Sequence, residues 1–381
     1  MRPVFINCTA ETFTPTKSGA ISTWLWETCR VAQTQGVEPW VITRTSAAPP
    51  YAWANTVFVD YPHIPRNRIL SKAWYLHRDL TGWGHVRQKA YVLRVVQAIR
   101  RAGLQDGPFI LHNDIEMAVY LRRQFPKAFL LHHAHNANPC SPKFRAQFGQ
   151  SVDTATAVSD YCSKWNADYF SMGEGSVKTI YNGVDLERFT PAQHPAGTPV
   201  INFVGRTDQA KAPDLLLKAA QQLSEKTTQF RLQILGSNHY GYSVPDAYQT
   251  EMAELSADLE RRGIAVSRPG FISRADLPEA LRRAQINVVP SRWEEPFALV
   301  LAEGMASGLA TIASRTGGMP EVLGSAGLLF ERDSVDGLAA HLETLVLDET
   351  CRAEYAQAAR CRAQEFPWER TWNEMKSLVR D

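Results

Sequence analysis

The sequence predicts a two-domain α/β protein in which two doubly wound, parallel sheets face each other across a cleft. The chain has 381 residues, more than the ~100–200 residues of an ordinary domain. Short β-branched or apolar runs alternate with helical segments, and this pattern starts again after a Pro- and Gly-rich stretch at 189–198. Strands separated by helices are typical of parallel sheets with crossover helices.

In the first half, short apolar runs predict strands at 3–8, 38–43, 55–60, 108–112, 127–133 and 154–158. Apolar residues at helical spacing, followed by Gly36, predict a helix over 19–35. A second helix is expected over 91–103, where it ends on Gly103. We place the first domain at 1–190.

In the second half, strands are expected at 198–205, 230–236, 264–270 and 286–290, with helices at 211–223, 246–262, 274–284 and 298–307. These elements make up a second domain over 191–365. A break at Phe366-Pro367 divides the last segment into two helices. Trp368 and Trp372 lie one turn apart in the final helix, which we expect to return to the first domain over 366–381.

Composition excludes several classes of protein. The chain is 44% hydrophobic, 10% aromatic and 21% charged, as expected of a soluble globular protein. No apolar run approaches the ~20 residues of a membrane helix, and the N-terminus lacks the features of a signal peptide. Six scattered cysteines without a CxxC pair favour a reducing cytosol over disulfides or a zinc site. We therefore expect a cytoplasmic protein without a metal site.

Nucleotide-binding motifs of two common kinds are missing. The segment after the first strand has neither GxGxxG nor GxxxxGK[ST], and the same holds after 198–205. This excludes nicotinamide-binding and P-loop proteins. Nucleic-acid binding is not expected either, because the cations follow no known module and the pI is ≈ 8.2.

The segment GRTDQAK is the first candidate for a ligand site. Gly205 ends a predicted strand, Arg206 follows it, and Lys211 stands at the start of the next helix. Loops at the ends of parallel strands point into the ligand crevice. There an Arg and a Lys can neutralise a diphosphate. The alternative is that both are ordinary solvated cations.

The segment SRWEEPFALVLAEGMASG at 291–308 is the second candidate. Glu295 precedes Pro296, which suits a first helical turn. Glu295 is suited to accept hydrogen bonds from sugar hydroxyls, and Glu303 to hold a ribose diol. Alternatively, Glu294 and Glu295 complement the helix dipole and Glu303 is solvated. The free N–H groups at the helix start would form an anion site; they belong to Phe297, Ala298 and Leu299.

These segments resemble the GT-B retaining glycosyltransferases of family 4, also called glycosyl transferases group 1. GRTDQAK is followed by EPFALVLAEGMASGLATIASRTGGMPEVL, which looks like the family's E-x7-E helix with its Gly-Gly loop. VSDYCSKW (158–165) and IYNGVDLERFTP (180–191) are similar to its interdomain segment. LLHHAHN (130–136) resembles its strand-end His, and Lys17-Ser18-Gly19-Ala20 its Gly-rich loop, although Ser18 stands where many members have Gly.

The resemblance implies a fold of two Rossmann-like domains and a role for each matching residue. Glu295, His135, Arg206 and Lys211 are the expected catalytic residues. His132 and His133 lie at the same strand end, but His135 with Asn136 is nearer the loop and is preferred. Donor binding is expected of Gly19, Gly205, Arg206, Lys211, the backbone of Phe271 and Ile272 (for the base), Glu295, Phe297, Ala298, Leu299 and Glu303.

By the same resemblance, the reaction is a metal-independent hexosyl transfer with retained configuration and without a cofactor. The donor would be a nucleotide-diphosphate sugar, most commonly UDP-linked, and the acceptor a glycan, a lipid or a small molecule. Two alternatives remain open. One is a nucleotide-sugar epimerase or hydrolase on the same scaffold, and the other is a catalytically silent binding protein.

The formal net charge of +2 divides unevenly between the halves. Residues 1–190 hold 21 Lys and Arg against 14 Asp and Glu, a balance of +7, and the rest carries −5. Within 66–101, nine basic residues stand against one acid and are interleaved with aromatics. Such a segment could contact anionic lipid or an anionic, lipid-linked acceptor. The alternative is a solvated helical face with a loop that shapes the acceptor pocket.

Overall fold

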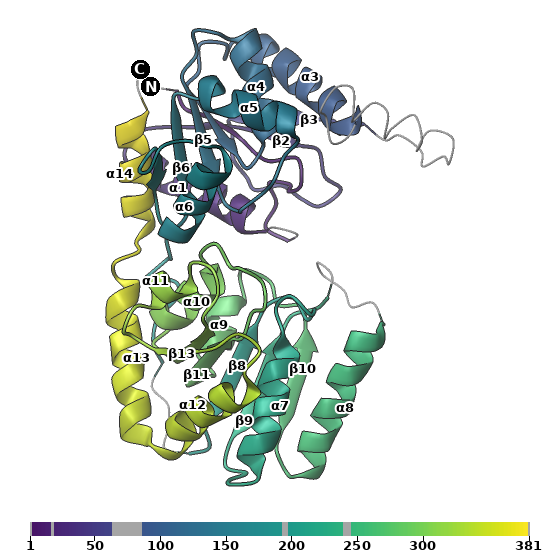
Figure 1. Ribbon diagram of the computed structural model, residues 1–381, viewed down its shortest axis with the longest axis vertical. Helices are drawn as coiled ribbons and strands as arrows, with labels where there is room; N and C mark the ends of the chain where they lie inside the picture. Colours follow the sequence, from purple (N-terminus) through teal and green to yellow (C-terminus); the bar gives the residue numbers. More distant parts are fainter. Residues whose placement is uncertain (1, 17–18, 63–85, 193–196, 239–244, 380–381) are drawn as a thin grey trace. The chain divides into compact units, whose positions relative to one another are not determined.

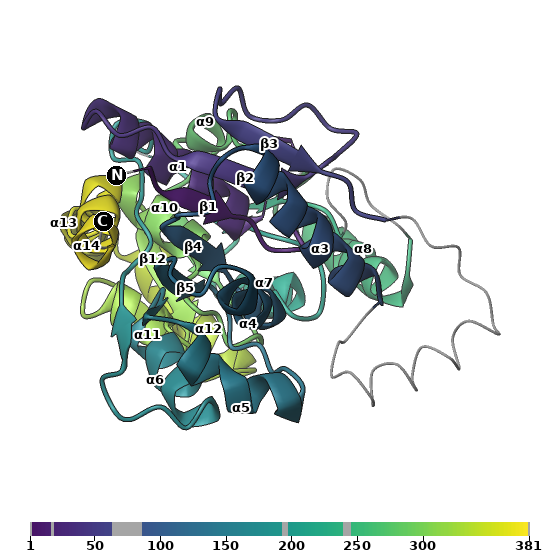
Figure 2. The ribbon, with the colours of Figure 1, turned by 90° about the horizontal axis from the view of Figure 1, so that it is seen from above.

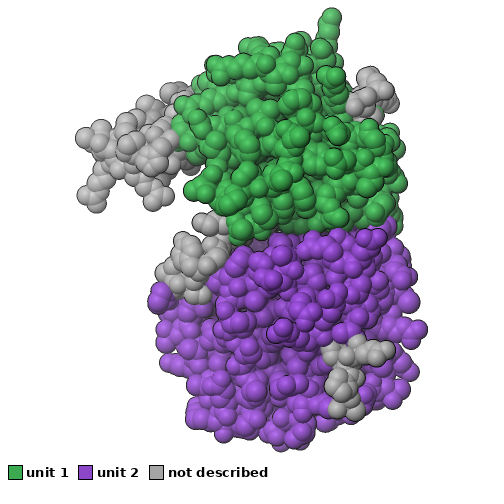
Figure 3. Space-filling view, turned by 180° about the vertical axis from the view of Figure 1, so that it is seen from behind, with its two compact units in different colours: residues 1–181, 368–381 green, residues 182–367 purple. Residues whose placement is uncertain are grey.

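The chain folds into two compact units, residues 1–181 with 368–381, and residues 182–367 (Figure 3). The computed structural model describes residues 2–16, 19–62, 86–192, 197–238 and 245–379. The expected boundary at 190–191 lies inside the second unit. Residues before it are bonded into that unit, because Arg282 Nη2 donates to Thr190 Oγ1 at 2.8 Å and Arg360 Nη1 to the carbonyl of Phe189 at 2.8 Å.

The first unit is built on a seven-stranded parallel sheet in the order β3-β2-β1-β4-β5-β6-β7. Its strands are β1 (Val4–Ile6), β2 (Trp40–Arg44), β3 (Thr56–Val59), β4 (Phe109–His112), β5 (Leu130–Ala134), β6 (Thr154–Ala157) and β7 (Val177–Thr179). Its helices are α1 (Ala20–Thr34), α3 (Val86–Arg101), α4 (Ile115–Gln124), α5 (Pro142–Ser151), α6 (Asp160–Tyr169) and α14 (Trp368–Leu378).

Alternation along β1 explains why helices cover both faces of this sheet. Val4 and Ile6 belong to an apolar cluster with residues of α3 and α4. Phe5 points the other way and packs edge-on against Trp24 of α1 and Trp372 of α14. Figure 2 shows α3 and α4 on one side of β1 and β4, with α1 on the other. Strands buried on both faces are typical of doubly wound sheets.

The C-terminal helix α14 belongs to the first unit (Figure 1). Trp372 is fully buried, and its indole N–H donates to Gln35 Oε1 at 3.1 Å. Thr371 Oγ1 donates to the carbonyl of Tyr181 at 2.8 Å. Just before the helix, Val184 N donates to the carbonyl of Phe366 at 2.7 Å inside the second unit. The chain thus changes unit between Pro367 and Trp368.

The second unit has a six-stranded parallel sheet in the order β10-β9-β8-β11-β12-β13. Its strands are β8 (Val200–Val204), β9 (Arg231–Leu235), β10 (Val266–Gly270), β11 (Ile286–Val289), β12 (Ala310–Ser314) and β13 (Leu328–Phe330). Its helices are α7 (Pro213–Ser224), α8 (Ala247–Arg261), α9 (Leu277–Leu281), α10 (Leu299–Ala306), α11 (Met319–Leu323), α12 (Val335–Leu347) and α13 (Glu349–Ala363).

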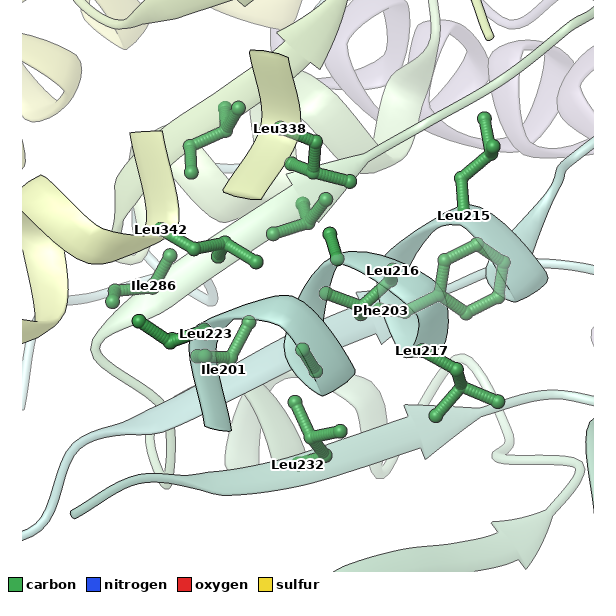
Figure 4. Packing of buried hydrophobic residues seen from close by; sticks show 14 of the residues in the cluster. Ile201, Phe203, Leu215, Leu216, Leu217, Leu223, Leu232, Ile286, Leu338 and Leu342 are labelled. Carbon is green, nitrogen blue, oxygen red and sulfur yellow. The ribbon is translucent and has the colours of Figure 1, made fainter. Parts of the chain in front are cut away.

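Leucines of α7 and α12 fill one face of this second sheet. Leu216, Leu223 and Leu342 are fully buried or nearly so and meet apolar side chains of β8, β9 and β11 (Figure 4). The hydrophobic effect of such burial, about 1.5–3 kcal/mol for each large side chain, holds the helices to the sheet. The prediction of two doubly wound α/β sheets is confirmed.

Each sheet reverses its strand order at one place, between β1 and β4 in the first unit and between β8 and β11 in the second. Helices leave the strands on opposite faces there, so a crevice opens outside the carboxyl ends of the two central strands. All the candidate segments of the second unit follow β8, β10 or β11. The topology therefore gathers them at one edge of one sheet.

A tight backbone crossing fixes the shape of that edge. Gly236, just after β9, has φ +141°, and a Cβ atom there would lie 1.7 Å from the carbonyl oxygen of Gly205. Gly236 N donates to the carbonyl of Gly270 at 2.8 Å, and Gly205 N to that of Leu235 at 3.0 Å. No side chain fits between these backbones.

We therefore expect Gly236→Ala to lower the free energy of unfolding by about 3 kcal/mol or more, because backbone must move. Gly263→Ala is the matched control. Gly263 also has positive φ, but an added Cβ meets nothing within 4 Å, so its cost should stay near 1–2 kcal/mol. Urea unfolding of both variants measures the difference. Equal losses of stability in the two variants would show that the positive φ, and not the close backbone contact, is what disfavours a side chain at residue 236.

Candidate functional site

The loop after β8 carries the two predicted cations. Arg206 is half-exposed and its Nη2 lies 3.1 Å from Asp208 Oδ2. The other oxygen of Asp208, Oδ1, accepts the backbone N–H of Lys211 at 3.0 Å. Asp208 therefore shapes the loop and holds Arg206 next to it. Sequence reasoning did not single out this aspartate, although it stands two residues after Arg206.

Glu295 and Lys211 form an ion pair across the two central strand ends. Lys211 Nζ lies 2.5 Å from Glu295 Oε1, and Ser291 Oγ lies 2.7 Å from the same oxygen. The Glu295 side chain is 7% exposed and that of Lys211 28%. A carboxylate this deeply buried needs such partners, because losing one would leave an unpaired charge away from water.

A Gly-Gly turn grips the backbone of Glu295. Gly318 N donates to the carbonyl of Glu295 at 2.7 Å, and a Cβ on Gly317 (φ +55°) would lie 2.1 Å from that oxygen. Glu294 has a different task from its neighbour, because its carboxylate accepts from Gly317 N at 2.7 Å and from Arg332 at 2.8 Å. Glu294 is thus a loop-holding residue.

The start of α10 differs from the expectation. Pro296 was expected in a first helical turn and the helix from residue 298, but α10 begins at Leu299. Ala298 is the reason, since its φ of 63° and ψ of 81° are left-handed and non-helical. Of the three amides expected at the helix N-terminus, those of Phe297 and Ala298 precede the helix and that of Leu299 opens it.

Glu303, inside α10, is buried and paired on one side. Its Oε1 accepts from Arg274 Nη1 at 2.6 Å, while its Oε2 is buried without a hydrogen-bond partner among the described residues. Burial raises the pKa of Glu303, and Arg274 and Arg188 oppose the rise. Arg188 Nη2 also donates to the carbonyl of Arg274 at 2.8 Å. The glutamate thus has one oxygen left for a ligand.

A half-buried ion pair ties the start of α7 to the loop after β11. Arg292 makes a fork with Asp214, with Nη1–Oδ1 at 2.7 Å and Nη2–Oδ2 at 2.9 Å. Its backbone N–H also donates to the carbonyl of Ala210 at 2.9 Å. Tyr248 OH donates to Asp214 Oδ1 at 2.6 Å. Planar guanidinium–carboxylate forks fix direction as well as distance, so Arg292 positions the segment that leads to Glu295.

The loop after β10, expected to hold the base, borders a small pocket. The pocket measures about 280 Å³, and Thr207, Gly236, Gln249, Arg268 and Gly270 line it. Phe271, the next residue, is 40% exposed, and Ile272 is half-buried. Burial lowers the pKa of Arg268. This pocket and the Glu295 loop are contributed by neighbouring strands of one sheet.

His135 lies in the first unit and is buried. Its Nε2 is 2.9 Å from His112 Nδ1, and its backbone N–H donates to Asn113 Oδ1 at 2.6 Å. The side chains of His133 and His135 pack against Trp24, whereas His132 packs edge-on against Phe148.

Burial lowers the pKa of His135 well below its usual range, and His112 and His132 add to this. The imidazole is therefore neutral at physiological pH, able to share a proton in a hydrogen bond but not to carry a charge.

Gly19 lies where the chain's own carboxylate approaches α1. An added Cβ would lie 2.2 Å from Glu11 Oε1, and Glu11 Oε2 accepts the N–H of Ser22 at 3.0 Å. Lys17 and Ser18, also expected in this loop, lie outside the described residues. The amides at the start of α1 thus hold an internal anion, as helix N-termini do.

Several partners in these contacts were not predicted from the sequence. Ser291 stands one helical turn before Glu295 and could have been noticed from that spacing. Arg274, Arg292 and His112 reach their partners across 29, 78 and 23 residues of chain, which no local pattern reveals. Within the described ranges, no three His, Cys, Asp or Glu side chains gather as metal ligands do. The helices described there are too short or too polar to cross a bilayer.

The ion pair between Arg292 and Asp214 should make the stability of the fold depend on pH in the acidic range. Burial alone would raise the pKa of Asp214, but the bonds from Arg292 and Tyr248 outweigh it and lower the pKa to about 2. A carboxyl with a depressed folded pKa stabilises above its unfolded value of ~3.9 and loses that contribution as pH falls towards 2. The contribution at neutral pH is about 2 kcal/mol.

We expect Asp214→Asn to be less stable than the wild type at pH 6 and to converge with it between pH 4 and 2. Urea unfolding at a series of pH values tests this. The exposed Asp106 gives the control variant Asp106→Asn, which should follow the wild type at every pH. A constant gap between wild type and Asp214→Asn down to pH 2 would contradict the assignment.

Comparison with known proteins shows what this part of the chain resembles. Residues 186–362 match the model of the glycosyl transferases group 1, a stretch that includes every site residue of the second unit. A D-inositol 3-phosphate glycosyltransferase of Nocardiopsis dassonvillei is 30% identical over 250 residues, which are 61% of this chain and 57% of the relative. The alignment thus spans just over half the length of that relative.

Solved structures match over nearly the whole chain. Sucrose-phosphate synthase from Thermosynechococcus elongatus superposes with a TM-score of 0.75 at 20% identity, over 99% of this chain and 98% of the other. HepE of Anabaena, solved in complex with UDP, gives 0.70 at 17% identity over 99% of both chains. At these identities the likeness concerns the fold. It shows that the chain has the GT-B fold, while residues 186–362 of its second unit are similar to the glycosyl transferases group 1.

Proposed function

We propose that this protein is a retaining glycosyltransferase that moves a hexosyl group from a UDP-sugar to an acceptor hydroxyl. One observation carries the proposal. Lys211 Nζ and Ser291 Oγ both lie within 2.7 Å of Glu295 Oε1. These contacts lie where the strand order of the second unit reverses, and this unit contains the residues that match the family model. Ligands of doubly wound sheets bind at such reversals.

The two cations would stabilise the negative charge of the leaving diphosphate. Arg206 is half-exposed, and Lys211 also has part of its surface open to solvent. When the bond between the anomeric carbon and the phosphate oxygen breaks, negative charge grows on the diphosphate. Fixed cations and backbone N–H groups stabilise that charge without reorganising. In the resting protein Lys211 is balanced by Glu295, so a bound diphosphate would share the lysine with it.

Glu295 and Glu303 would hold hydroxyl groups. Glu295 faces the reacting sugar in this proposal, and its carboxylate accepts hydrogen bonds from sugar hydroxyls. Glu303 has one oxygen held by Arg274 and the other unpartnered among the described residues, which suits a ribose hydroxyl. The base would stack beside the backbone of Phe271 and Ile272. HepE of Anabaena, of similar fold, has been solved with UDP, which favours uridine.

The transfer itself needs no covalent intermediate. The acceptor oxygen would bond to the anomeric carbon on the face that the phosphate leaves, so configuration is retained. The acceptor proton would pass to the departing phosphate oxygen. The charge on the diphosphate would be met by Arg206, Lys211 and the amides of residues 297–299 in place of a metal ion. His135, neutral because it is buried, would hydrogen-bond the sugar, and Gly19 would lie on the donor's phosphate side.

The proposal leaves the acceptor among glycans, lipids and small molecules. Peripheral membrane contact through the basic segment 66–101 also stays a proposal, because residues 66–85 of that segment lie outside the described residues.

Removing Glu295 should separate catalysis from binding. We expect Glu295→Ala to lower sugar transfer by at least 100-fold, since it loses hydroxyl contacts that position the sugar, while UDP affinity stays within about threefold. Lys211→Ala should weaken UDP binding and transfer alike, because the phosphate cation is gone. Calorimetry with UDP and mass spectrometry of products over a panel of UDP-sugars give both readouts. Transfer by Glu295→Ala at the wild-type rate would refute the site.

Glu303 should decide how strongly the ribose is recognised. A hydrogen bond to a charged group contributes about 1.5–3 kcal/mol, so the wild type should bind UDP at least tenfold more tightly than 2′,3′-dideoxy-UDP. In Glu303→Gln this preference should fall to less than threefold. Glu294→Gln is the control, because Glu294 bonds to Gly317 and Arg332 instead. If Glu303→Gln kept the full preference for UDP over 2′,3′-dideoxy-UDP, Glu303 would not be the residue that binds the ribose.

A further inference from the structure

The first unit has a pocket of its own at the place where its strand order reverses. It measures about 330 Å³ and lies between the loop after β1, residues 8–11, and the segment that leads from β4 into α4, residues 113–116. Three carboxyl groups line it, those of Glu11, Asp114 and Glu116, together with the side-chain amides of Asn113, Asn136 and Asn138. The lining is therefore acidic and rich in hydrogen-bonding groups.

None of the three carboxyls has a cationic partner within the part of the chain that the structure describes. Glu11 accepts from the backbone N–H of Ser22 at 3.0 Å. Asp114 Oδ1 accepts from Met117 N at 3.1 Å and from Gln88 Nε2 at 3.4 Å, and Glu116 Oε2 accepts from Gln88 Nε2 at 3.3 Å. These are neutral donors. The first half of the chain has a balance of +7, yet no described Lys, Arg or His is paired with these acids.

One carboxyl oxygen of the residues that line the pocket has no hydrogen-bond partner in the described part of the chain. Asp114 is 6% exposed, and its Oδ2 is buried without a hydrogen-bond partner among the described residues. Leaving a buried polar atom unpaired costs about 1–3 kcal/mol. Native structures carry few such atoms, and a bound water molecule, ion or ligand is one way in which their bonding is completed. Asp114 therefore points to an occupant that donates hydrogen bonds.

The electrostatics identify the charge of that occupant. Burial, together with the nearby Asp114, raises the pKa of Glu116 to about 7, and burial raises the pKa values of Asp114 and Glu11 as well. Three acids that are expensive to ionise together are stabilised by a cation placed among them. An anionic group would instead be repelled and desolvated. The pocket thus favours the opposite charge from the one suggested by the overall balance of the first half.

We propose that the pocket binds a protonated primary amine of a polyhydroxylated acceptor, such as an amino sugar or aminocyclitol. The inference rests on the proposed function, which makes this molecule the acceptor. An ammonium group donates three hydrogen bonds, which matches carboxyls from two loops. The amides of Asn113, Asn136 and Asn138 bind neighbouring hydroxyls, as they can both donate and accept. N-acetylation removes the charge and adds bulk, so the acetylated form of the same sugar is rejected.

The test compares ligands that differ only at nitrogen. The full chain is titrated with methyl α-D-glucosaminide, its N-acetyl derivative and methyl α-D-glucoside at pH 7.5, with binding followed by ligand-observed NMR. We expect the amine to bind at least tenfold more tightly than either of the others. Glu116→Gln and Asp114→Asn should each lower amine affinity at least tenfold, while UDP affinity measured in the same samples is unchanged.

Two controls keep the result interpretable. Glu174→Gln, at an exposed acid of the same unit, should bind the amine as the wild type does. Asp114 caps α4 by accepting Met117 N, and Asn preserves such a cap. Should Asp114→Asn nevertheless unfold, Glu116→Gln alone carries the test.

Equal binding of the amine and the glucoside would overturn the proposal. So would amine affinity that is lost equally in Glu174→Gln, or Ca²⁺ or Mn²⁺ alone occupying the pocket and excluding the amine. Absence of UDP binding alongside selective amine binding would instead sink the glycosyltransferase proposal while leaving the amine site standing. The two failures are therefore distinguishable.

Discussion

The parallel pairing of β8 with β11 is the constraint on which the donor side of this protein depends. These strands are far apart in sequence but adjacent in the sheet, with Ile286 opposite Ile201. Their carboxyl ends therefore deliver two loops to one place. The contact between Lys211 and Glu295, 84 residues apart, follows from that adjacency. The fork between Arg292 and Asp214 then fixes the second loop to the start of α7.

Glycines allow backbone segments at the carboxyl edge of the second sheet to approach more closely than residues with a Cβ atom would. Gly236 crosses the carbonyl of Gly205, and Gly317 crosses that of Glu295. A third close approach lies beneath the site, where a Cβ on Gly304 of α10 would lie 2.2 Å from Asn287 Nδ2 of β11. Bringing α10 so near the sheet seats Glu303 in its interior, where Arg274 meets it. Backbone proximity thus sets the depth at which the two glutamates lie.

The two units solve the problem of buried charge in different ways. In the second unit, acids of the candidate site have cations: Lys211 for Glu295, Arg274 for Glu303 and Arg292 for Asp214. In the first unit, the corresponding crevice holds acids bonded to neutral donors, beside histidines whose pKa values are lowered by burial. Paired charges give a rigid site, whereas acids without a cationic partner among the described residues favour a cationic ligand.

The sequence by itself determined the alternation of strands and helices and the two-sheet fold, because apolar periodicity and local motifs are properties of neighbouring residues. It indicated Lys211, Glu295 and Glu303 as a group. It did not indicate that α10 begins only at Leu299, because alanine does not favour the left-handed conformation that Ala298 adopts. Nor did it give the acidic pocket of the first unit, because overall charge averages over surfaces that never meet. Only the tertiary structure decided which acids have cations among the described residues, since a buried carboxyl's partner is chosen by strand order and not by distance along the chain.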